Sequence, residues 1–326
     1  MNIPEIKGGQ ILITGGSGVV GSYVIDSLKE DFDIVVADLN KPATDVKFVK
    51  VNLREPFSLS SDFELCIDLA LSVGGIQYFT KHPVENLRDN PRITANILDA
   101  IVNSKIQQVI YTSSSAVYEN ATEYPTSEDS ILTLPTPSSP YGLSKLVGEN
   151  LCKAYHEQFG IHFTLLRLFN VYGPREAPEP EYAHVIPELI RKVLSGQSPV
   201  EIYGTGEQTR TFTHGRDIGR AYSLSIKNKN AINQAFNVSG NQEMTIIEVL
   251  RKIWKMTGHK EEQLKIKHLP PFPHDIKRRF PSNKKIFEKL KWQPEIPFDD
   301  GLLETIEWIK KLGYRKISDS LSSLLI

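Results

Sequence analysis

The chain has 326 residues, of which 40% are hydrophobic and 24% charged, an ordinary balance for a folded protein of one large or two smaller domains. Its 38 Lys and Arg residues nearly match its 39 Asp and Glu residues, so nothing in the charge favours nucleic acid or an anionic membrane as a partner. Two cysteines are too few for a disulfide framework or a cysteine-based zinc site, and we expect no metal and a reducing, cytoplasmic location.

The distribution of apolar residues argues against targeting or membrane segments. The first ten residues are mostly polar, and the first apolar run leads directly into glycines. No run approaches the roughly 18 apolar residues that a membrane helix needs. We therefore expect a protein with neither a signal peptide nor a membrane span.

In the first 170 residues, short runs rich in Ile, Val and Leu alternate with longer segments of helical periodicity. This alternation predicts right-handed βαβ crossovers and a doubly wound, parallel α/β sheet. The predicted strands are Ile11–Thr14, Ile34–Asp38, Leu65–Leu71, Val109–Ser113 and Phe163–Leu168. The predicted helices are Gly18–Lys29, Leu87–Ser104 and Tyr141–Phe159.

After Asn170 the pattern changes, because four prolines between Gly173 and Pro187 forbid a long regular element. Further on, the periodicity predicts two helices and one more buried strand, at Glu188–Ser195, Thr245–Thr257 and Ala235–Ser239 respectively. The chain is therefore expected to leave the sheet and return to it. We predict a larger domain from residues 1–169 and about 215–240, and a smaller one from about 170–214 and 241–326.

A glycine-rich turn follows the first predicted strand and opens the first helix. Glycine permits the tight turn and lets the backbone approach a pyrophosphate, and the helix N-terminus offers free N–H groups. Asp38, at the end of the second strand, is placed to accept hydrogen bonds from ribose hydroxyls and to repel a 2′-phosphate, which favours NAD over NADP. The alternative is a purely structural turn. The predicted NAD contacts are Gly15, Gly18, Val19, Val20, Gly21 and Asp38.

Tyr141 and Lys145 are four residues apart at the start of a predicted helix, so both project from one face. A tyrosine with a pKa near 10 is a poor base, but an ammonium about 4 Å away favours its anion by about 4 kcal/mol at an effective dielectric of 20. Such a spacing is common by chance. Its conjunction with the glycine turn and a strand ending in serines, Thr112–Ser115, indicates a proton-transfer site beside a nicotinamide.

Together these motifs resemble the extended short-chain dehydrogenase/reductase family, in its nucleotide-sugar epimerase and dehydratase branch of UDP-glucose 4-epimerase-like enzymes. The matching segments span nearly the whole chain: Thr14–Gly21, Asp38, Ser113–Tyr118, Pro140–Lys145, Arg167–Arg175, Tyr203–Asp217 and Arg279–Pro294. The resemblance implies a Rossmann fold, with Ser114, Tyr141 and Lys145 as the catalytic hydroxyl, the base and its activating lysine. Further NAD contacts that it implies are Leu53, Leu69, Tyr141 and Lys145.

The resemblance also implies a nucleotide-diphosphate sugar as the partner molecule, bound by the smaller domain while the larger one binds NAD. Guanidinium groups suit the diphosphate, because they are planar and permanently charged. The implied substrate contacts are Ser114, Ser115, Asn170, Arg210 and Arg279, with Tyr203, Gln208 and Asp217 near the nucleotide or supporting that loop. A homodimer formed through the helices Leu87–Ser104 and Tyr141–Phe159 is a further implication, although these helices could equally face the chain's own sheet.

Ala116 bears on the reaction. Dehydratases and decarboxylases of this family have a glutamate at its position, and the 3,5-epimerases have a cysteine, whereas alanine supplies no acid or base. The remaining set suffices for C4 epimerisation of a nucleotide-diphosphate hexose through a transient 4-keto sugar. Dehydration, epimerisation at C2, C3 or C5, and 4-keto reduction stay open, with an extra acid or base from His184, Lys81 or His82. A non-catalytic NAD sensor is also possible, although it would not need the three catalytic residues.

Several positions depart from the family pattern and indicate a divergent subgroup. They are Asn52, Asp68, Gly215 and Ser282. The run Val73–Ile76 resembles GDP-sugar 3,5-epimerases and GDP-fucose synthases more than ordinary 4-epimerases. It is expected near the point where nicotinamide and sugar meet, so the substrate is expected to be unusual.

Overall fold

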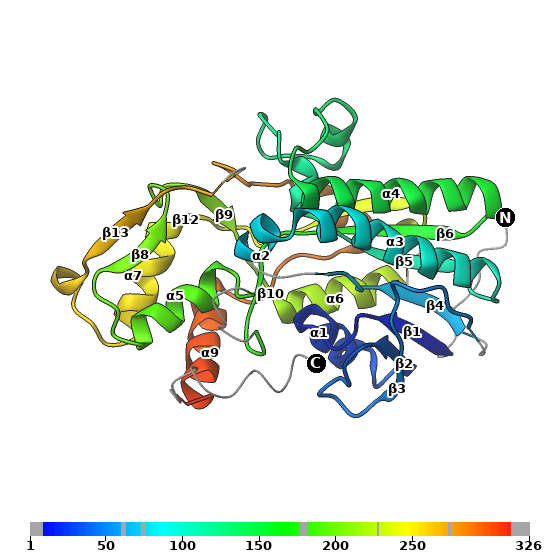
Figure 1. The fold of residues 1–326 in the computed structure, drawn as a ribbon, viewed down its shortest axis with the longest axis horizontal. Helices are drawn as coiled ribbons and strands as arrows, with labels where there is room; N and C mark the ends of the chain where they lie inside the picture. The colour runs from blue at the N-terminus through cyan, green and yellow to red at the C-terminus, as the bar shows by residue number, and fades with distance from the viewer. Residues whose placement is uncertain are drawn as a thin grey trace.

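The computed structural model describes residues 9–59, 63–72, 76–176, 182–226, 228–272 and 275–313. Of the run Val73–Ile76, residues 73–75 lie outside this described part. The described chain forms a large lobe around one sheet and a smaller lobe beside it (Figure 1).

Seven parallel strands form the main sheet, in the order β11-β6-β5-β4-β1-β2-β3. Its strands are β1 (Gln10–Thr14), β2 (Asp33–Asp38), β3 (Lys47–Lys50), β4 (Phe63–Asp68), β5 (Gln108–Ser114), β6 (His162–Leu168) and β11 (Gln234–Val238). The central strands are apolar on both faces because helices cover both sides. Strands β2 and β3 lie on one side of β1, whereas β4 and the strands after it lie on the other side. The carboxyl ends of β1 and β4 therefore form the switch point where such sheets bind ligands. The predicted doubly wound α/β sheet is confirmed.

Two helices cover each face of the sheet. Helices α1 (Val19–Leu28) and α6 (Gly215–Ile226) pack on one face, in a core that includes Ile25 and Ile218. Helices α3 (Pro83–Val102) and α4 (Pro140–Phe159) run side by side on the other face (Figure 1). The short helix α2 (Ile76–Lys81) precedes α3.

The smaller lobe has its own apolar core, to which Ile190, Leu250 and Ile306 belong. Its helices are α5 (Val185–Leu194), α7 (Ile246–Met256) and α9 (Phe298–Lys311). Its strands are short pairs, β8 (Val200–Tyr203) with β13 (Ile266–Leu269) and β9 (Thr209–Thr211) with β12 (Glu243–Thr245). A further pair, β7 (Val171–Tyr172) with β10 (Thr213–His214), joins the lobes.

The C-terminal segment contributes to both cores. Helix α8 (Lys284–Leu290) packs near β11, and its Ile286 and Leu290 belong to the core of the large lobe together with Trp292. These side chains come from the segment that the sequence assigns to the smaller domain. The division of the chain into domains stays a prediction.

Predicted and observed elements differ where burial is uneven. The predicted strand Leu65–Leu71 ends earlier, at Asp68. The N–H of the next residue, Leu69, donates to the Thr14 carbonyl at 3.0 Å, and the chain then leaves the sheet. The edge strand β3 was not predicted, since its side chains are mostly exposed and form no apolar run.

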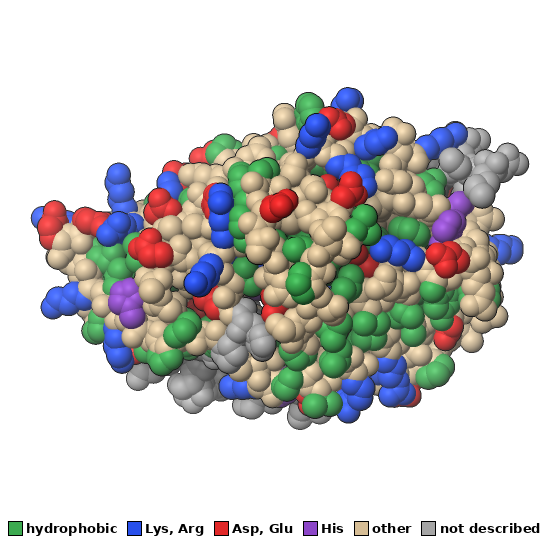
Figure 2. Space-filling model, turned by 90° about the horizontal axis from the view of Figure 1, so that it is seen from above, with side chains coloured by type: hydrophobic (Ala, Val, Ile, Leu, Met, Phe, Trp, Pro, Cys, Tyr) green, Lys and Arg blue, Asp and Glu red, His purple; other side chains and the backbone are tan. Residues whose placement is uncertain are grey.

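Basic and acidic side chains are interspersed over the face shown in Figure 2. Among the described residues, no helix is both long enough and apolar enough to cross a membrane. Cys66 and Cys152 are both buried and unpaired.

A buried ion pair connects helix α4 to strand β6. Arg167 and Glu149 are 1% and 0% exposed and make two charge-assisted bonds, Nε to Oε1 at 2.8 Å and Nη2 to Oε2 at 2.7 Å. Ser113 donates to the same carboxylate at 2.6 Å, and the guanidinium also donates to the Glu128 carbonyl at 3.0 Å. Removal of one partner would leave an uncompensated charge in the core.

We predict that Arg167→Met lowers the free energy of unfolding by about 3–5 kcal/mol, because the Glu149 carboxylate then lies buried without its cation. Urea unfolding measures the loss. The double variant Glu149→Met/Arg167→Met should recover most of it. As a control, Arg216→Met breaks a surface pair with Glu304 and should cost less than about 1 kcal/mol. Equal small losses in the buried and surface variants would contradict this account.

Candidate active site

The glycine-rich turn packs closely against neighbouring backbone, which only glycine allows. Gly15 has φ +68°, and a Cβ there would lie 2.6 Å from the Ala70 backbone. A Cβ on Gly21 would lie 2.4 Å from the Gly16 carbonyl oxygen, so helix α1 packs closely against the turn. Gly18 is the N-cap of α1 and no side chain caps it, which leaves the first N–H groups available to an anion. Val19 and Val20 begin the helix and are partly buried.

Asp38 closes this turn from the neighbouring strand. Its Oδ2 accepts from the Ser17 backbone N–H at 3.1 Å, and its Oδ1 accepts from the Asn40 N–H at 3.1 Å. The carboxylate is thereby held at the glycine turn, where a ribose hydroxyl can donate to it. The arrangement fits a dinucleotide with a free 2′-hydroxyl.

Two further predicted NAD contacts lie along the same edge of the sheet. Leu53, in the loop after β3, is 6% exposed, and so is Leu69, directly after β4. Both side chains pack in the hydrophobic cores of the large lobe.

Helix α4 begins at a well-defined point, which fixes the position of Tyr141. Ser139 is its N-cap and accepts from the Gly142 N–H at 3.1 Å, and Pro140 occupies the first helical position. Tyr141 thus lies in the first turn, close to the Ser114 side chain at the end of β5. Burial raises the pKa of Tyr141, while the Ser114 hydrogen bond and the nearby Arg279 cation oppose that shift.

Lys145 lies one turn further along α4 and is 4% exposed. Its Nζ donates to the Thr112 carbonyl at 2.7 Å and lies 5.1 Å from the centre of the Tyr111 ring. Burial lowers the pKa of Lys145 to about 8, against the opposing effect of Asp68 and Glu149. The sequence predicts that this ammonium lowers the pKa of Tyr141. In the structure, Ser114 and Arg279 are the groups that lower it.

Asp68 is a site residue whose role sequence reasoning missed. It ends β4 and is 2% exposed, and its Oδ1 accepts from the Thr14 hydroxyl at 3.0 Å and from the Ala70 N–H at 3.1 Å. Burial raises the pKa of Asp68 to about 6, while the Lys145 cation lowers it. The carboxylate therefore connects the glycine turn electrostatically to Lys145. The departure at Asp68 from the family pattern was the available signal.

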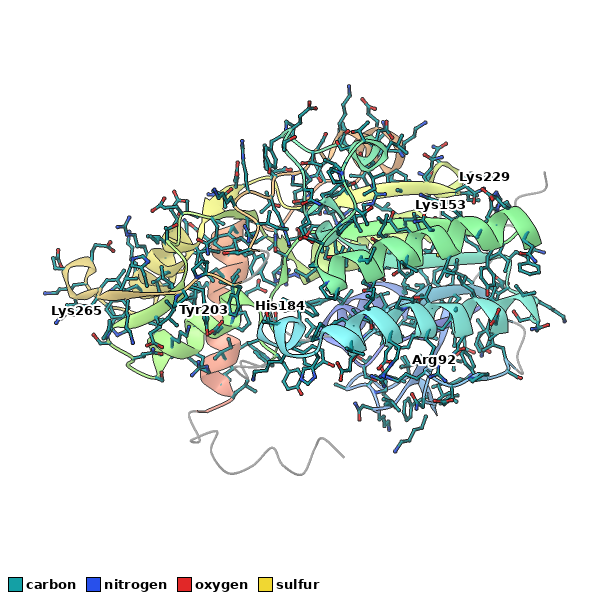
Figure 3. The ribbon with its side chains drawn as sticks, turned by 45° about the horizontal axis from the view of Figure 1, so that its top comes forward. Arg92, Lys153, His184, Tyr203, Lys229 and Lys265 are labelled. Atoms are coloured by element: carbon teal, nitrogen blue, oxygen red, sulfur yellow. The ribbon has the colours of Figure 1, made fainter. Side chains whose placement is uncertain are left out.

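A cavity of about 440 Å³ opens beside Tyr141 and extends into the smaller lobe. Figure 3 shows His184 near the junction of the lobes and Tyr203 deeper in the smaller one. The residues that line the cavity include Ala116, Tyr141, Asn170, Arg210 and Arg279. Ser115 reaches this group indirectly, since its hydroxyl accepts from Arg279 Nη1 at 3.2 Å.

Two arginines, Arg210 and Arg279, lie side by side in the cavity wall. Arg210 pairs with Asp275 at 2.9 Å, and it donates to the Ile276 carbonyl at 2.6 Å. Arg279 has a buried Nε without a partner among the described residues, and burial together with the nearby Arg210 lowers its pKa to about 9. An anion between these side chains would relieve both effects.

Other predicted contacts have mixed outcomes. Asn170 lines the cavity, but its Nδ2 donates to the Thr211 carbonyl at 2.7 Å, so its oxygen is the free end. Gln208 supports the Tyr203 loop through a bond of 3.0 Å to its carbonyl. Asp217 instead accepts from the N–H groups of Glu295 and Ile296, at 3.0 and 3.1 Å, and fastens the C-terminal segment.

Two features of the cavity wall were only partly anticipated. The rings of Tyr203 and Phe272 pack together with centroids 4.0 Å apart and planes 37° apart, and both line the cavity as aromatic groups that a base could contact. His184 lines the cavity, and its Nδ1 lies 2.5 Å from Glu176 Oε1, a carboxylate that raises the pKa of His184. Of the three residues considered as an extra acid or base, His184 lines this cavity, while Lys81 and His82 are absent from its described lining.

We predict that Asp68→Asn lowers the pKa of Lys145 below about 8, by about one unit, because a neutral amide no longer opposes the effect of burial. Lys145 is then less often charged at neutral pH. The 13Cε shift of lysine-labelled protein, assigned with Lys145→Arg, follows the titration. Asp99→Asn, on the outer side of α3, is the control and should leave the midpoint in place. The same midpoint in both variants would count against the coupling.

Comparisons with known proteins identify the family of the chain. The model of the NAD dependent epimerase/dehydratase family matches residues 11–239. A Methanocaldococcus jannaschii protein, whose name gives UDP-glucose 4-epimerase as a provisional activity, is 33% identical over 313 residues, covering 92% of this chain and 98% of that protein. GDP-L-fucose synthase of Sinorhizobium fredii is 28% identical over 309 residues, covering 93% and 96% of the two chains.

Among solved structures, the UDP-glucuronic acid 4-epimerase of Bacillus cereus, in complex with UDP-glucuronic acid and NAD, superposes with a TM-score of 0.81. It is 28% identical, and the match covers 93% of this chain and 99% of that one. With its parallel sheet, glycine turn and Ser–Tyr–Lys arrangement, the chain belongs to the NAD-dependent epimerase/dehydratase family of nucleotide-sugar enzymes, within the extended short-chain dehydrogenases/reductases.

Proposed function

We propose that this chain is a C4 epimerase of a nucleotide-diphosphate hexose. The observation that carries the proposal is the placement of Tyr141 beside Ser114, next to a cavity that Tyr141 lines together with Ala116, which occupies the position of the family's extra acid. The site thus holds one proton-transfer centre beside the dinucleotide turn. One such centre is enough to oxidise and reduce the same carbon.

In this proposal Tyr141 takes the proton of the sugar 4-hydroxyl, and the Ser114 hydroxyl holds the same oxygen. When bound at the glycine turn, NAD would supply the hydride acceptor, and later the hydride donor, for C4. The positive charge that favours the phenolate comes from Arg279, while Lys145 is held one turn along α4 by the Thr112 carbonyl. Between the two transfers the 4-keto sugar turns over, and Tyr141 then returns the proton.

The diphosphate holds the sugar during that turn. We assign to it Arg210 and Arg279, whose Nε has no partner in the described part of the chain. Tyr203 and Phe272 offer the surface on which the base stacks. Because these contacts are remote from C4, their binding energy keeps the intermediate in place without fixing one face of the sugar. The names of the Methanocaldococcus and Bacillus cereus relatives favour a UDP-sugar.

One observation favours a second candidate function. His184 and Glu176 form a hydrogen-bonded pair on the wall of the same cavity, and the carboxylate favours the charged imidazolium. A second proton-transfer group of this kind would suit epimerisation at C3 or C5 of a 4-keto sugar, or its reduction. The similarity to GDP-L-fucose synthase agrees with this candidate.

We predict that the NAD-loaded protein converts one member of a panel of UDP-, GDP-, CDP- and dTDP-hexoses into its 4-epimer, with no change in mass. Proton NMR and mass spectrometry in D2O identify the product. Tyr141→Phe should lower turnover by at least about a hundredfold while NAD stays bound. Solvent deuterium at C3 or C5 would favour the second candidate. Loss of 18 or 44 mass units, from water or carbon dioxide, would contradict both.

Homodimerisation and a cytoplasmic location stay predictions. Apolar side chains on the outer sides of α3 and α4 are compatible with a two-fold contact. Val84, Leu87 and Phe159 are 61%, 41% and 49% exposed in the single chain.

A further inference from the structure

We infer that Phe79 of helix α2 is a positioning residue for the Tyr141 ring, and that its face-on contact keeps the phenol hydroxyl aimed at Ser114. This inference rests on the proposed function, in which Tyr141 is the proton acceptor. Phe79 belongs to no motif from which the site was assigned, and its neighbours on α2 hold it from outside the catalytic helix.

The two rings are close to parallel. Their centroids lie 4.2 Å apart and their planes differ by 16°, and both residues line the cavity. A flip about the Cβ–Cγ bond of Tyr141 leaves its oxygen on the rotation axis. A swing about the Cα–Cβ bond, by contrast, carries the oxygen sideways and breaks the bond to Ser114. A second ring lying flat against the first blocks this swing.

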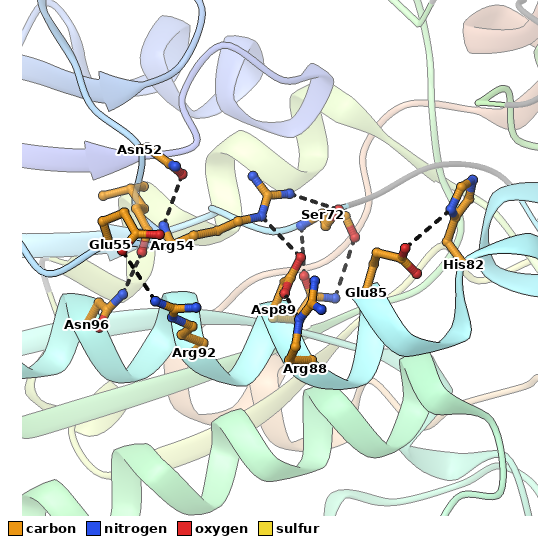
Figure 4. Close-up of polar contacts among 12 residues, drawn as sticks. Asn52, Arg54, Glu55, Ser72, His82, Glu85, Arg88, Asp89, Arg92 and Asn96 are labelled. Atoms are coloured by element: carbon orange, nitrogen blue, oxygen red, sulfur yellow. Dashed lines mark hydrogen bonds and ion pairs between the residues drawn. The ribbon is translucent and has the colours of Figure 1, made fainter.

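Helix α2 is itself fixed to the large lobe, so Phe79 has a firm base. The hydroxyl of the adjacent Tyr78 lies 2.8 Å from that of Ser72, to which Arg54 Nη2 donates at 3.2 Å. Arg54 also pairs with Asp89 of α3 at 3.2 Å, so it bridges Ser72 and that helix (Figure 4). Asn90 accepts from the Ser72 N–H at 2.7 Å.

The ring of Tyr78 is also held by its neighbours. It stacks on His82 with centroids 4.5 Å apart and lies 5.7 Å from the ring of Tyr182. Two successive side chains of α2 therefore have different roles. Tyr78 anchors the helix through Ser72 and these rings, and Phe79 stacks on the ring of Tyr141.

Phe79 also keeps water from one face of the phenol. Removing its ring opens that face, and solvation of the phenolate then lowers the pKa of Tyr141. Other groups near the phenol are Ser114 and Tyr111 of β5, Lys145 of the same helix and Arg279 from the smaller lobe. None of these is changed by a substitution at Phe79, so a shift can be ascribed to the lost ring.

The test places 3-fluorotyrosine at position 141 of the NAD-loaded protein and follows its 19F signal against pH, which requires no substrate. In Phe79→Ala the titration midpoint should fall by about one unit, and the signal should show faster ring motion. Phe79→Leu, which keeps most of the volume, should shift the midpoint in the same direction, and Phe79→Tyr should restore it. Phe159→Ala is the matched control, since Phe159 contacts Tyr155 at the far end of α4.

With a converted sugar in hand, Phe79→Ala and Phe79→Leu should each lower kcat by about tenfold with a smaller change in KM. The wild-type midpoint and line shape in both variants would overturn the inference, as would a loss of thermal stability without any change in the fluorine signal. If the unaltered enzyme converts no sugar, the proposed function fails while the fluorine titration still decides the role of Phe79. If Phe79→Ala does not fold, Phe79→Leu decides it.

Discussion

The site depends on how helix α4 is fastened to the end of strand β5. Three side chains of the helix, at intervals of four residues, face the strand: Tyr141, Lys145 and Glu149. Their partners on β5 are, in the same order, Ser114, Thr112 and Ser113. Because a period of four keeps these side chains on one helix face, one packing contact places the hydroxyl, the ammonium and the structural carboxylate together. The buried Arg167–Glu149 pair anchors the far end of this row.

Buried charge divides the site into two parts. Near the glycine turn, Asp68 and Lys145 carry opposite charges. Each therefore keeps the other closer to its charged form than burial alone would allow. In the smaller lobe, Arg210 pairs with Asp275, whereas Arg279 forms no ion pair among the described residues, and the two guanidinium groups repel each other. The first arrangement suits proton handling, and the second suits a diphosphate that arrives with its own negative charge.

Local patterns predicted the parts of the site that lie within one strand–turn–helix unit. The glycine turn, Asp38 and the spacing of Tyr141 and Lys145 were all readable in this way, and the parallel sheet followed from the alternation of apolar runs. The sequence did not reveal contacts made between distant segments. Phe79 meets Tyr141, and Asp68 meets Lys145, only after the sheet and helices have assembled. The lysine was expected to act on the phenol, whereas burial ties it to the Thr112 carbonyl.

The central claim is that a single carbon, C4, is oxidised and reduced with the same hydride beside the Tyr141 phenol. The most direct measurement uses a nucleotide-diphosphate hexose with deuterium at C4, in ordinary water and with the NAD-loaded protein. The account predicts a 4-epimer that keeps its deuterium at C4. Exchange of that deuterium for solvent hydrogen, or inversion at another carbon while C4 is unchanged, would contradict it.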